Sequence, residues 1–253
     1  MRWFLRLSYC GAPFHGWQRQ PNAVSVQQTV EEALSTVMRT PISITGAGRT
    51  DTGVNARTMF AHFDTDRDIT DPKRLLTALN RLCGRSVALH ALTRVRDDAH
   101  ARFDATSRTY KYFATTSKSP FLHPLAWQAP PDLDMEAMNE AASTLLSDSD
   151  FTSFAKLHSD AKTTICDVSE AIWSREVSSV TEEEMMVFTI TADRFLRNMV
   201  RAVVGTLVDV GRGKMSLRQF RDVVEAKDRC AAGTSMPPQA LSLWDVGYPY
   251  PLN

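Results

Sequence analysis

The pattern of hydrophobic and polar positions divides the first hundred residues into six segments. Apolar side chains that recur every second residue predict a half-buried strand, and those that recur every third or fourth residue predict an amphipathic helix. In chain order the pattern predicts a strand over residues 3–9, a helix over 26–37, strands over 42–44 and 59–63, a helix over 71–82 and a strand over 87–95. This β-α-β-β-α-β order is that of the split βαβ unit of ferredoxin-like folds.

Both predicted helices have start signals in the sequence. Ser25 is placed to be the N-cap of the first helix, with Gln28 at the reciprocal position of a capping box. Pro41 follows the end of this helix, where a proline stops a helical pattern. Asp71 and Pro72 open the second helix, with the proline at the tolerated first-turn position.

The second half of the chain is less regular but contains the same kinds of element. A strand is predicted over residues 107–114, and a proline-rich connection over 120–131 leads to a helix that begins at Asp134. The pattern then predicts a hairpin of strands over 163–173 and 185–192, a long helix over 195–210, a helix from Ser216 and a closing strand over 241–246. We expect an α/β (α+β) protein of two ferredoxin-like or RRM-like lobes with antiparallel sheets, residues 1–105 and 106–253.

The charged residues are segregated along a chain whose net charge is zero. Residues 1–120 carry 17 Lys and Arg against 10 Asp and Glu, residues 121–193 carry 3 against 14, and residues 194–253 carry 9 against 5. Two basic segments that flank an acidic one can form a basic face on a neutral molecule. We therefore expect a basic cleft between the lobes and an anionic partner, and a merely solvated acidic segment is the alternative.

The cysteines and the apolar runs exclude other classes of protein. The four cysteines are far apart, and no Cys or His pair has zinc-ligand spacing, so we expect no metal and reduced thiols in a cytosolic protein. Arg2 and Arg6 interrupt the apolar start, and no run approaches ~18 apolar residues. We expect neither a signal peptide nor a membrane span.

A glycine-rich loop supplies the candidate catalytic residue. Gly46, Gly48 and Gly53 enclose the segment Arg49-Thr50-Asp51 between two predicted strands. Such clusters occur where the backbone takes unusual dihedral angles or approaches a ligand, so Asp51 is a candidate catalytic carboxylate. An Asp that only hydrogen-bonds its own turn is the common alternative. The loop lacks the Gly-Lys-Ser/Thr ending of a P-loop and the third glycine of a dinucleotide fingerprint.

The loop over residues 12–21 mixes aromatic, basic and amide side chains. This composition is typical of sites that hold single-stranded bases and phosphates, so we assign Trp17 and Arg19 to substrate binding. Core packing is the competing interpretation of Trp17. The six histidines show no triad or metal spacing, and we interpret His15 and His100 as structural or RNA-contacting.

The segment from Gly48 to Ala56, Gly-Arg-Thr-Asp-Thr-Gly-Val-Asn-Ala, resembles the active-site loop of the TruA family of tRNA pseudouridine synthases. The family pattern has Ala and His where this chain has Thr52 and Asn55. Further segments that resemble family motifs follow the family's order: Tyr9–Gln18, His100–Phe103, Arg108–Tyr112, Phe195–Arg201 and Gly233–Leu241. The resemblance spans nearly the whole chain.

The resemblance implies an isomerase that converts uridine to pseudouridine in the anticodon stem-loop of tRNA, at positions 38 to 40. It implies a cytoplasmic homodimer that needs neither a cofactor nor a metal. Asp51 in the first lobe corresponds to the nucleophile or proton acceptor, and Arg197 in the second lobe to the cation that pairs with it. Tyr110 corresponds to the ring that stacks on the flipped base, and Arg49 to the base-flipping residue. Arg102 and Arg201 are assigned more loosely to substrate binding.

Two of these assignments have plainer alternatives in the sequence. Arg194, Arg197 and Arg201 recur at intervals of three and four, so we expect them on one face of a helix, where a solvated basic stripe is the alternative. Tyr110 and Tyr112 face the same side of a predicted strand, and two core tyrosines are the alternative.

Three other functions compete with the one that the resemblance implies. A non-catalytic RNA-binding protein with RRM-like lobes is disfavoured because the RNP1 pattern is absent. A glycoside hydrolase normally needs two paired carboxylates, and the glycine-rich loop offers one. An enzyme that modifies uridines in a different RNA remains open.

Overall fold

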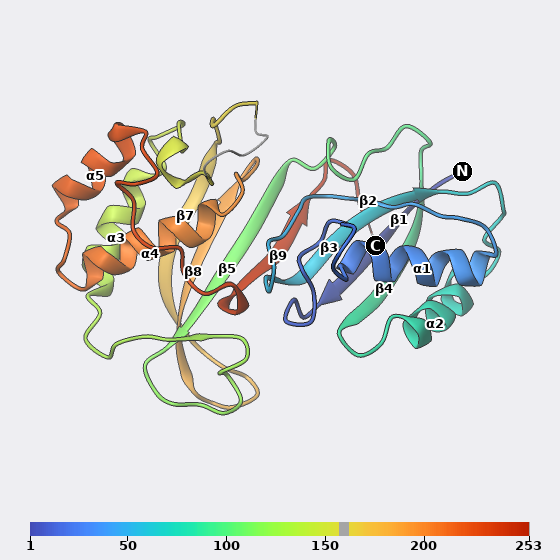
Figure 1. Ribbon diagram of the computed structural model, residues 1–253, viewed down its shortest axis with the longest axis horizontal. Helices are drawn as coiled ribbons and strands as arrows, with labels where there is room; N and C mark the ends of the chain where they lie inside the picture. Colours follow the sequence, from blue (N-terminus) through green and yellow to red (C-terminus); the bar gives the residue numbers. More distant parts are fainter. Residues whose placement is uncertain (157–161, 253) are drawn as a thin grey trace. The chain divides into compact units, whose positions relative to one another are not determined.

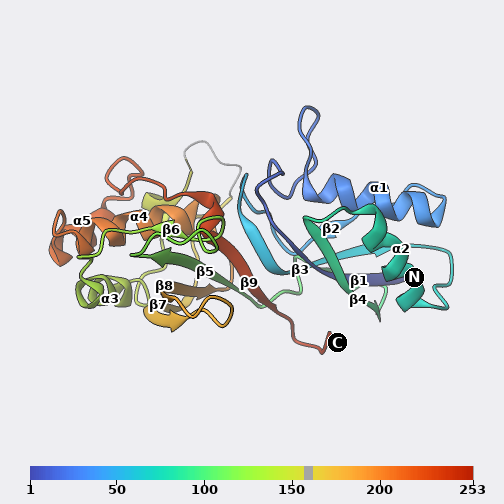
Figure 2. The same cartoon turned by 90° about the horizontal axis from the view of Figure 1, so that it is seen from below.

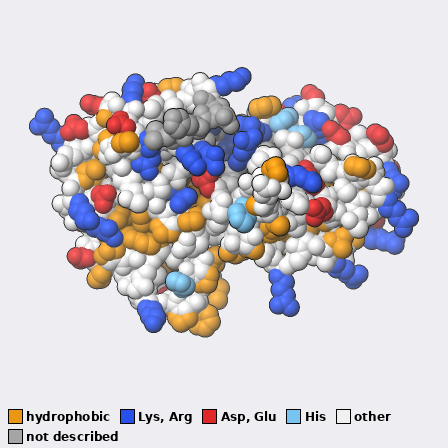
Figure 3. All heavy atoms as spheres, viewed as in Figure 1, with side chains coloured by type: hydrophobic (Ala, Val, Ile, Leu, Met, Phe, Trp, Pro, Cys, Tyr) orange, Lys and Arg blue, Asp and Glu red, His pale blue; other side chains and the backbone are white. Residues whose placement is uncertain are grey.

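The computed structural model describes residues 1–156 and 162–252 (Figure 1). Backbone contacts divide the chain into two compact units, Met1–Ser107 with Leu243–Asn253, and Arg108–Ser242. The mixed α and β composition and the mostly antiparallel strand pairing confirm the predicted α+β class. The lobe boundary at residue 105 and the basic cleft stay predictions. On the face shown in Figure 3, Lys and Arg side chains occur over both units, with Asp and Glu among them.

The first unit has the predicted β-α-β-β-α-β order. Its elements are β1 (Arg2–Tyr9), α1 (Val26–Met38), β2 (Thr45–Gly46), β3 (Asn55–Asp64), α2 (Pro72–Leu82) and β4 (Val87–Val95). The sheet runs β4-β1-β3, antiparallel throughout, and β2 pairs with β3. Helices α1 and α2 contact each other and lie against one face of this sheet (Figures 1 and 2). The core between them contains Leu5 and Leu7 of β1, and Val30 and Leu34 of α1, all fully buried.

Both predicted helix starts are confirmed in the first unit. Ser25 Oγ accepts a hydrogen bond from the backbone N–H of Gln28, and the Asp71 side chain accepts one from Arg74. The Gln28 amide, predicted to complete a capping box, donates instead to Glu32.

The strand predicted over residues 42–44 is wrong. Ile42 and Ile44 are buried as their alternation suggested, but β2 begins only at Thr45. Side chains of α1 bind the backbone of this segment: the Ile42 N–H donates to Ser35 Oγ, and the Ile44 N–H donates to Glu31 Oε1. Backbone groups that bond to a helix in this way are not free to pair in a strand ladder.

The second unit contains a three-stranded antiparallel core sheet in the order β5-β8-β7. Its elements are β5 (Ser107–Thr115), β6 (Trp127–Gln128), α3 (Met135–Thr144), the 3-10 turn η1 (Thr152–Phe154), β7 (Val168–Val177), β8 (Glu184–Ala192), α4 (Met199–Gly211), α5 (Leu217–Ala226) and the 3-10 turn η2 (Pro238–Ala240). Helices α3, α4 and α5 pack on one another, and α3 also contacts β7. The closing strand β9 (Leu241–Gly247) was predicted, whereas the two-residue β6 was not.

The predicted hairpin is present as β7 and β8, but β7 begins at Val168 rather than at residue 163. The preceding residues pair with another segment: Phe151 N–H donates to the Thr164 carbonyl, and Cys166 N–H donates to the Ser149 carbonyl. Within the described part of the chain, no helix is both long and apolar enough to cross a membrane.

Candidate active site

Asp51 lies in the loop between β2 and β3, and its side chain is half-buried. Gly53 has φ of 79°, and the Val54 N–H donates to the Asp51 carbonyl, which closes a tight turn. Thr50 is anchored twice, because its Oγ1 lies 2.8 Å from the Tyr9 hydroxyl and its carbonyl accepts from the Trp17 N–H. The residue before Asp51 is therefore tied both to β1 and to the loop that follows β1.

Asn55, one of the two departures from the family pattern in the active-site loop, has a structural role. Its Oδ1 accepts a hydrogen bond of 2.7 Å from the backbone N–H of Gly11, and the side chain is buried. A Cβ atom at Gly11 would lie 2.2 Å from the Val54 carbonyl oxygen, so only glycine allows this close approach. The two loops are thus in direct backbone contact beside Asp51. Thr52, the other departure, is exposed, and nothing in the structure explains it.

Trp17 packs beneath the glycine-rich loop. Its side chain is 2% exposed, and a Cβ atom at Gly46 would lie only 2.5 Å from the indole ring. This position matches the core interpretation of Trp17, and a direct role in substrate binding stays a prediction.

A cavity of about 180 Å³ next to this loop brings together three of the predicted substrate-binding residues. It is lined by Trp17, Gln18, Gln27, Ile44, Thr45, Gly46, Gly48, Arg49 and Arg102. Arg49 is exposed, and its Nε donates to Gln18 Oε1 at 3.1 Å. The sequence did not single out Gln18, whose only signal is its place in the Gly-Trp-Gln segment.

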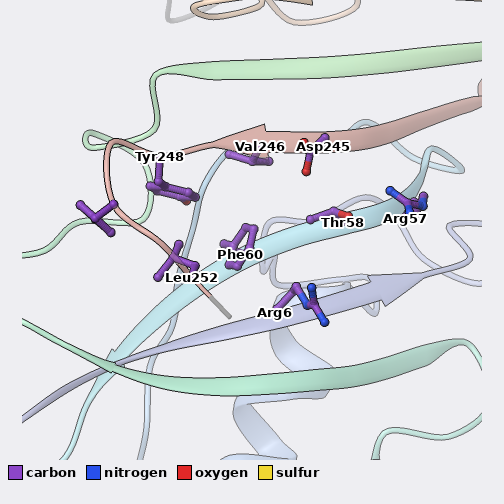
Figure 4. A pocket seen from close by; sticks show the side chains of 9 residues that line it. Arg6, Arg57, Thr58, Phe60, Asp245, Val246, Tyr248 and Leu252 are labelled. Atoms are coloured by element: carbon purple, nitrogen blue, oxygen red, sulfur yellow. The ribbon is translucent and has the colours of Figure 1, made fainter.

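A larger cavity of about 270 Å³ lies elsewhere in the first unit (Figure 4). Arg6 of β1, Arg57 of β3 and Asp245 of β9 line it, together with the ring of Tyr248. None of the residues assigned to catalysis lines it, so size alone does not identify the site.

Two histidines shape the loop that carries Arg102. His100 Nδ1 accepts from the backbone N–H groups of Arg102 and Phe103, at 3.1 and 3.2 Å. His62 Nδ1 accepts from the Ala101 N–H at 3.1 Å. Burial and the charge of Arg2 lower the pKa of His62 to about 4, and the same two causes lower the pKa of His100. Both rings are therefore neutral near pH 7, as acceptors must be.

Of these two histidines, His100 was predicted to be structural or RNA-contacting, and the contacts give it a structural role. His62 was missed because it lies in the middle of β3, where the alternation of the strand gives no sign of a partner. Arg19 forms an ion pair of 3.1 Å with Glu31, whose side chain is almost fully buried, so its assignment to tRNA phosphates stays a prediction.

In the second unit, Tyr110 and Tyr112 face the same side of β5, as predicted. Tyr110 is 9% exposed and meets the ring of Phe195 edge to face, with centroids 5.1 Å apart. Tyr112 is fully buried, and burial raises its pKa. The core interpretation therefore holds for Tyr112, and the assignment of Tyr110 to base stacking stays a prediction.

The helical face predicted for Arg194, Arg197 and Arg201 is wrong. Helix α4 begins at Met199, and Asn198 before it has φ of 66°, in the left-handed region. A left-handed residue interrupts the helical path, so Arg194 and Arg197 lie before the helix and only Arg201 is helical. Asn198 is held there because its Nδ2 donates to Ser235 Oγ at 2.6 Å.

The segment around Ser235 packs closely on α4. Arg201 Nε donates to the Met236 carbonyl at 2.6 Å, and the Met236 N–H donates to the Arg201 carbonyl. A Cβ atom at Gly205 would lie 1.8 Å from the Thr234 carbonyl oxygen. Three predicted site residues, Tyr110, Arg197 and Arg201, thus belong to the second unit, whereas Asp51 and Arg49 belong to the first.

Comparisons with known proteins agree with these motifs. A family model described as tRNA pseudouridine synthase matches residues 141–249. The tRNA pseudouridine synthase A of Parabacteroides distasonis is 55% identical over 248 residues, which cover 98% of this chain and 96% of that protein. Relatives of the same name from Bacteroides fragilis and Cereibacter sphaeroides are 51% and 41% identical, with the same coverage of both chains. The chain therefore belongs to the tRNA pseudouridine synthase A family, and the protein is an isomerase that forms pseudouridine in tRNA.

Proposed function

We propose that this protein isomerises uridines 38 to 40 in the anticodon stem-loop of tRNA, with Asp51 as the nucleophile or proton acceptor. The observation that carries the proposal is the Asp51 loop. It combines the family's Gly-Arg-Thr-Asp sequence with anchors on both sides of the carboxylate, at Thr50 and at Asn55. A carboxylate fixed on a loop that also lines a cavity with two arginines suits an anionic substrate.

The reaction breaks the bond between C1′ of the ribose and N1 of uracil and forms a bond between C1′ and C5. The uracil turns in between, and the proton on C5 is lost to the solvent while N1 gains one, so the overall composition is unchanged. One carboxylate is sufficient, because it either attacks the sugar or accepts a proton from it. No electrons are transferred, and the chemistry itself calls for no redox cofactor.

The other roles follow from the family resemblance. Arg49 fills the space that the flipped uridine leaves, since extrusion of a base costs a few kcal/mol that protein contacts must offset. Tyr110 stacks on the flipped base, and Arg197 is the cation that compensates the Asp51 carboxylate. Arg19, Trp17 and the two arginines 102 and 201 contribute to tRNA binding. We place the protein in the cytoplasm with its tRNA substrate and infer that it acts as a homodimer.

The test is the substitution Asp51→Asn, which keeps the size of the side chain. An amide neither attacks the sugar nor accepts its proton, so turnover in a tritium-release assay on C5-labelled tRNA should be abolished. Affinity for tRNA and the melting temperature should stay close to wild type. Asp68→Asn, the same change at an exposed carboxylate of the first unit, is the matched control and should be fully active.

Appreciable turnover by Asp51→Asn would remove Asp51 from the chemistry. Mapping pseudouridine in tRNA from cells with and without the gene tests the positions. Loss of pseudouridine at other tRNA positions, or in another RNA, would replace the proposed substrate.

A further inference from the structure

A chain of side-chain hydrogen bonds connects Arg49 to a buried carboxylate on α1. Arg49 Nε donates to Gln18 Oε1 at 3.1 Å, and Gln18 Nε2 donates to Gln27 Oε1 at 2.8 Å. Gln27 Nε2 then donates to Glu31 Oε1 at 3.0 Å. Glu31 is 5% exposed, so the chain runs from the protein surface into the core of the first unit.

Neighbouring groups that can only donate or can only accept a hydrogen bond determine the orientation of both amides in this chain. Gln27 Nε2 donates to the Ile44 carbonyl, which can only accept, and Gln27 Oε1 accepts from the backbone N–H of Arg19, which can only donate. Gln18 must therefore present its NH2 group to Gln27. Its carbonyl oxygen is left for Arg49 Nε, which can only donate.

The inner end of the chain is held by several bonds at once. The Glu31 carboxylate also accepts from the Ile44 N–H at 3.0 Å and from Arg19 at 3.1 Å. Removal of one partner from such a buried group leaves a desolvated polar atom unsatisfied, which is costly. Gln27 thus has one well-defined position, and Gln18 is placed against it.

We propose that Gln18 is a positioning residue for catalysis, because it holds the Arg49 guanidinium in the orientation needed when the target uridine leaves the RNA stem. This inference rests on the proposed function of Arg49. One guanidinium offers five N–H donors. The bond at Nε therefore fixes the plane of the guanidinium group, while its other N–H donors remain for the RNA. A long, exposed arginine would otherwise sample many rotamers, and ordering it would cost free energy at each turnover.

The test is Gln18→Met, which keeps the length of the side chain and removes both amide groups. Because Gln18 is exposed, the core should be unaffected and the melting temperature unchanged. We expect kcat on tRNA to fall roughly three- to tenfold, the loss that corresponds to one hydrogen bond of ordinary net strength, with little change in KM. Arg49→Met should lose at least as much, and Gln18→Met should add nothing in the Arg49→Met background.

Gln28→Met is the matched control. Gln28 Nε2 donates to the carboxylate of the exposed Glu32 at 2.9 Å, just as Gln27 donates to Glu31 one residue earlier on α1, but this bond has no connection to Gln18 or Arg49. This variant should keep wild-type kcat and KM. Each set of assays includes wild type and Asp51→Asn, so that failure of the Gln18 inference can be distinguished from failure of the proposed function.

Three outcomes would overturn the inference. Wild-type kcat for Gln18→Met refutes a positioning role, and a loss that adds fully to that of Arg49→Met shows that Gln18 acts by another route. In both cases active wild type and inactive Asp51→Asn leave the proposed function standing. Wild type without activity on tRNA overturns the proposed function and the positioning role together.

Discussion

The buried imidazole of His62 should make the protein acid-labile by a calculable amount. The folded state holds its pKa at about 4, against 6.5 as the ordinary value, chiefly because burial disfavours the charged ring. As the pH falls below 6.5, the unfolded chain takes up a proton at this residue and the folded protein does not. The contribution of His62 to the free energy of unfolding is therefore fully present above pH 6.5 and is lost progressively as the pH falls toward 4.

The expected loss between pH 7.5 and pH 5 is about 2 kcal/mol, and it approaches about 3 kcal/mol at lower pH. His90 and His100 also have lowered pKa values and act in the same direction, so the wild-type loss includes more than this residue. Comparison with His62→Asn isolates the contribution of His62. Asparagine presents an acceptor oxygen close to the position of Nδ1, so the bond from the Ala101 N–H can persist without a titrating group.

The assay is urea unfolding of the full chain at both pH values, followed by circular dichroism. The free energy of unfolding of His62→Asn should fall by about 2 kcal/mol less than that of wild type between the two pH values. His15→Asn, the same change at an exposed histidine, is the control for the substitution itself. Equal pH dependence in wild type and His62→Asn would refute the reasoning, whatever the absolute stability of the variant.

Two further predictions concern the loop and the charge pattern. Gly46→Ala should lower the free energy of unfolding by roughly 1–3 kcal/mol, because its Cβ would meet the buried Trp17 ring at 2.5 Å, whereas Gly48→Ala, whose Cβ would meet open space, should have little effect in urea unfolding. The affinity for tRNA should fall steeply with KCl, with a log–log slope set by the number of phosphates contacted, although the net charge is zero. A flat salt dependence would mean that the segregated charges do not contact the RNA.

The sequence predicted the first unit well because its signals are local. The alternation in β1, the cap at Ser25 and the proline at position 72 each act within a few residues, and all three elements occur where predicted. The loop between β2 and β3 that carries Asp51 was also predicted from the sequence, because three glycines around Arg49-Thr50-Asp51 form a local pattern.

The wrong predictions concern segments whose backbone conformation is determined by side chains that are distant in the sequence. Ile42 and Ile44 alternate like a strand, but Ser35 and Glu31 of α1 bind their N–H groups. In the second unit the periodicity suggested a helix that includes Arg197, but Asn198 adopts a left-handed conformation with a bond to Ser235. No periodicity within a short window contains information about a partner 37 residues away.

The Gln18 chain shows the same limit for functional residues. Gln27 and Glu31 stand four residues apart on a predicted helix, so their contact could be anticipated. Gln18 reaches them only because the loop after β1 folds back over α1, with the Gln27 N–H donating to the Trp17 carbonyl. That approach depends on loop geometry, which the sequence pattern does not determine.

The loops near Asp51 are held by buried acceptors rather than by regular structure. Glu31 receives the N–H of Ile44, Asn55 receives that of Gly11, and His62 receives that of Ala101. All three acceptor residues are at most 6% exposed. A buried acceptor that loses its partner pays the full desolvation cost, so each loop is held more firmly than an exposed hydrogen bond could hold it. A catalytic group needs such rigid support, because a misplacement of about 1 Å can cost a large part of the rate. The glycines therefore allow the loops to approach one another closely, and hydrogen bonds to the buried acceptors determine the final position of each loop.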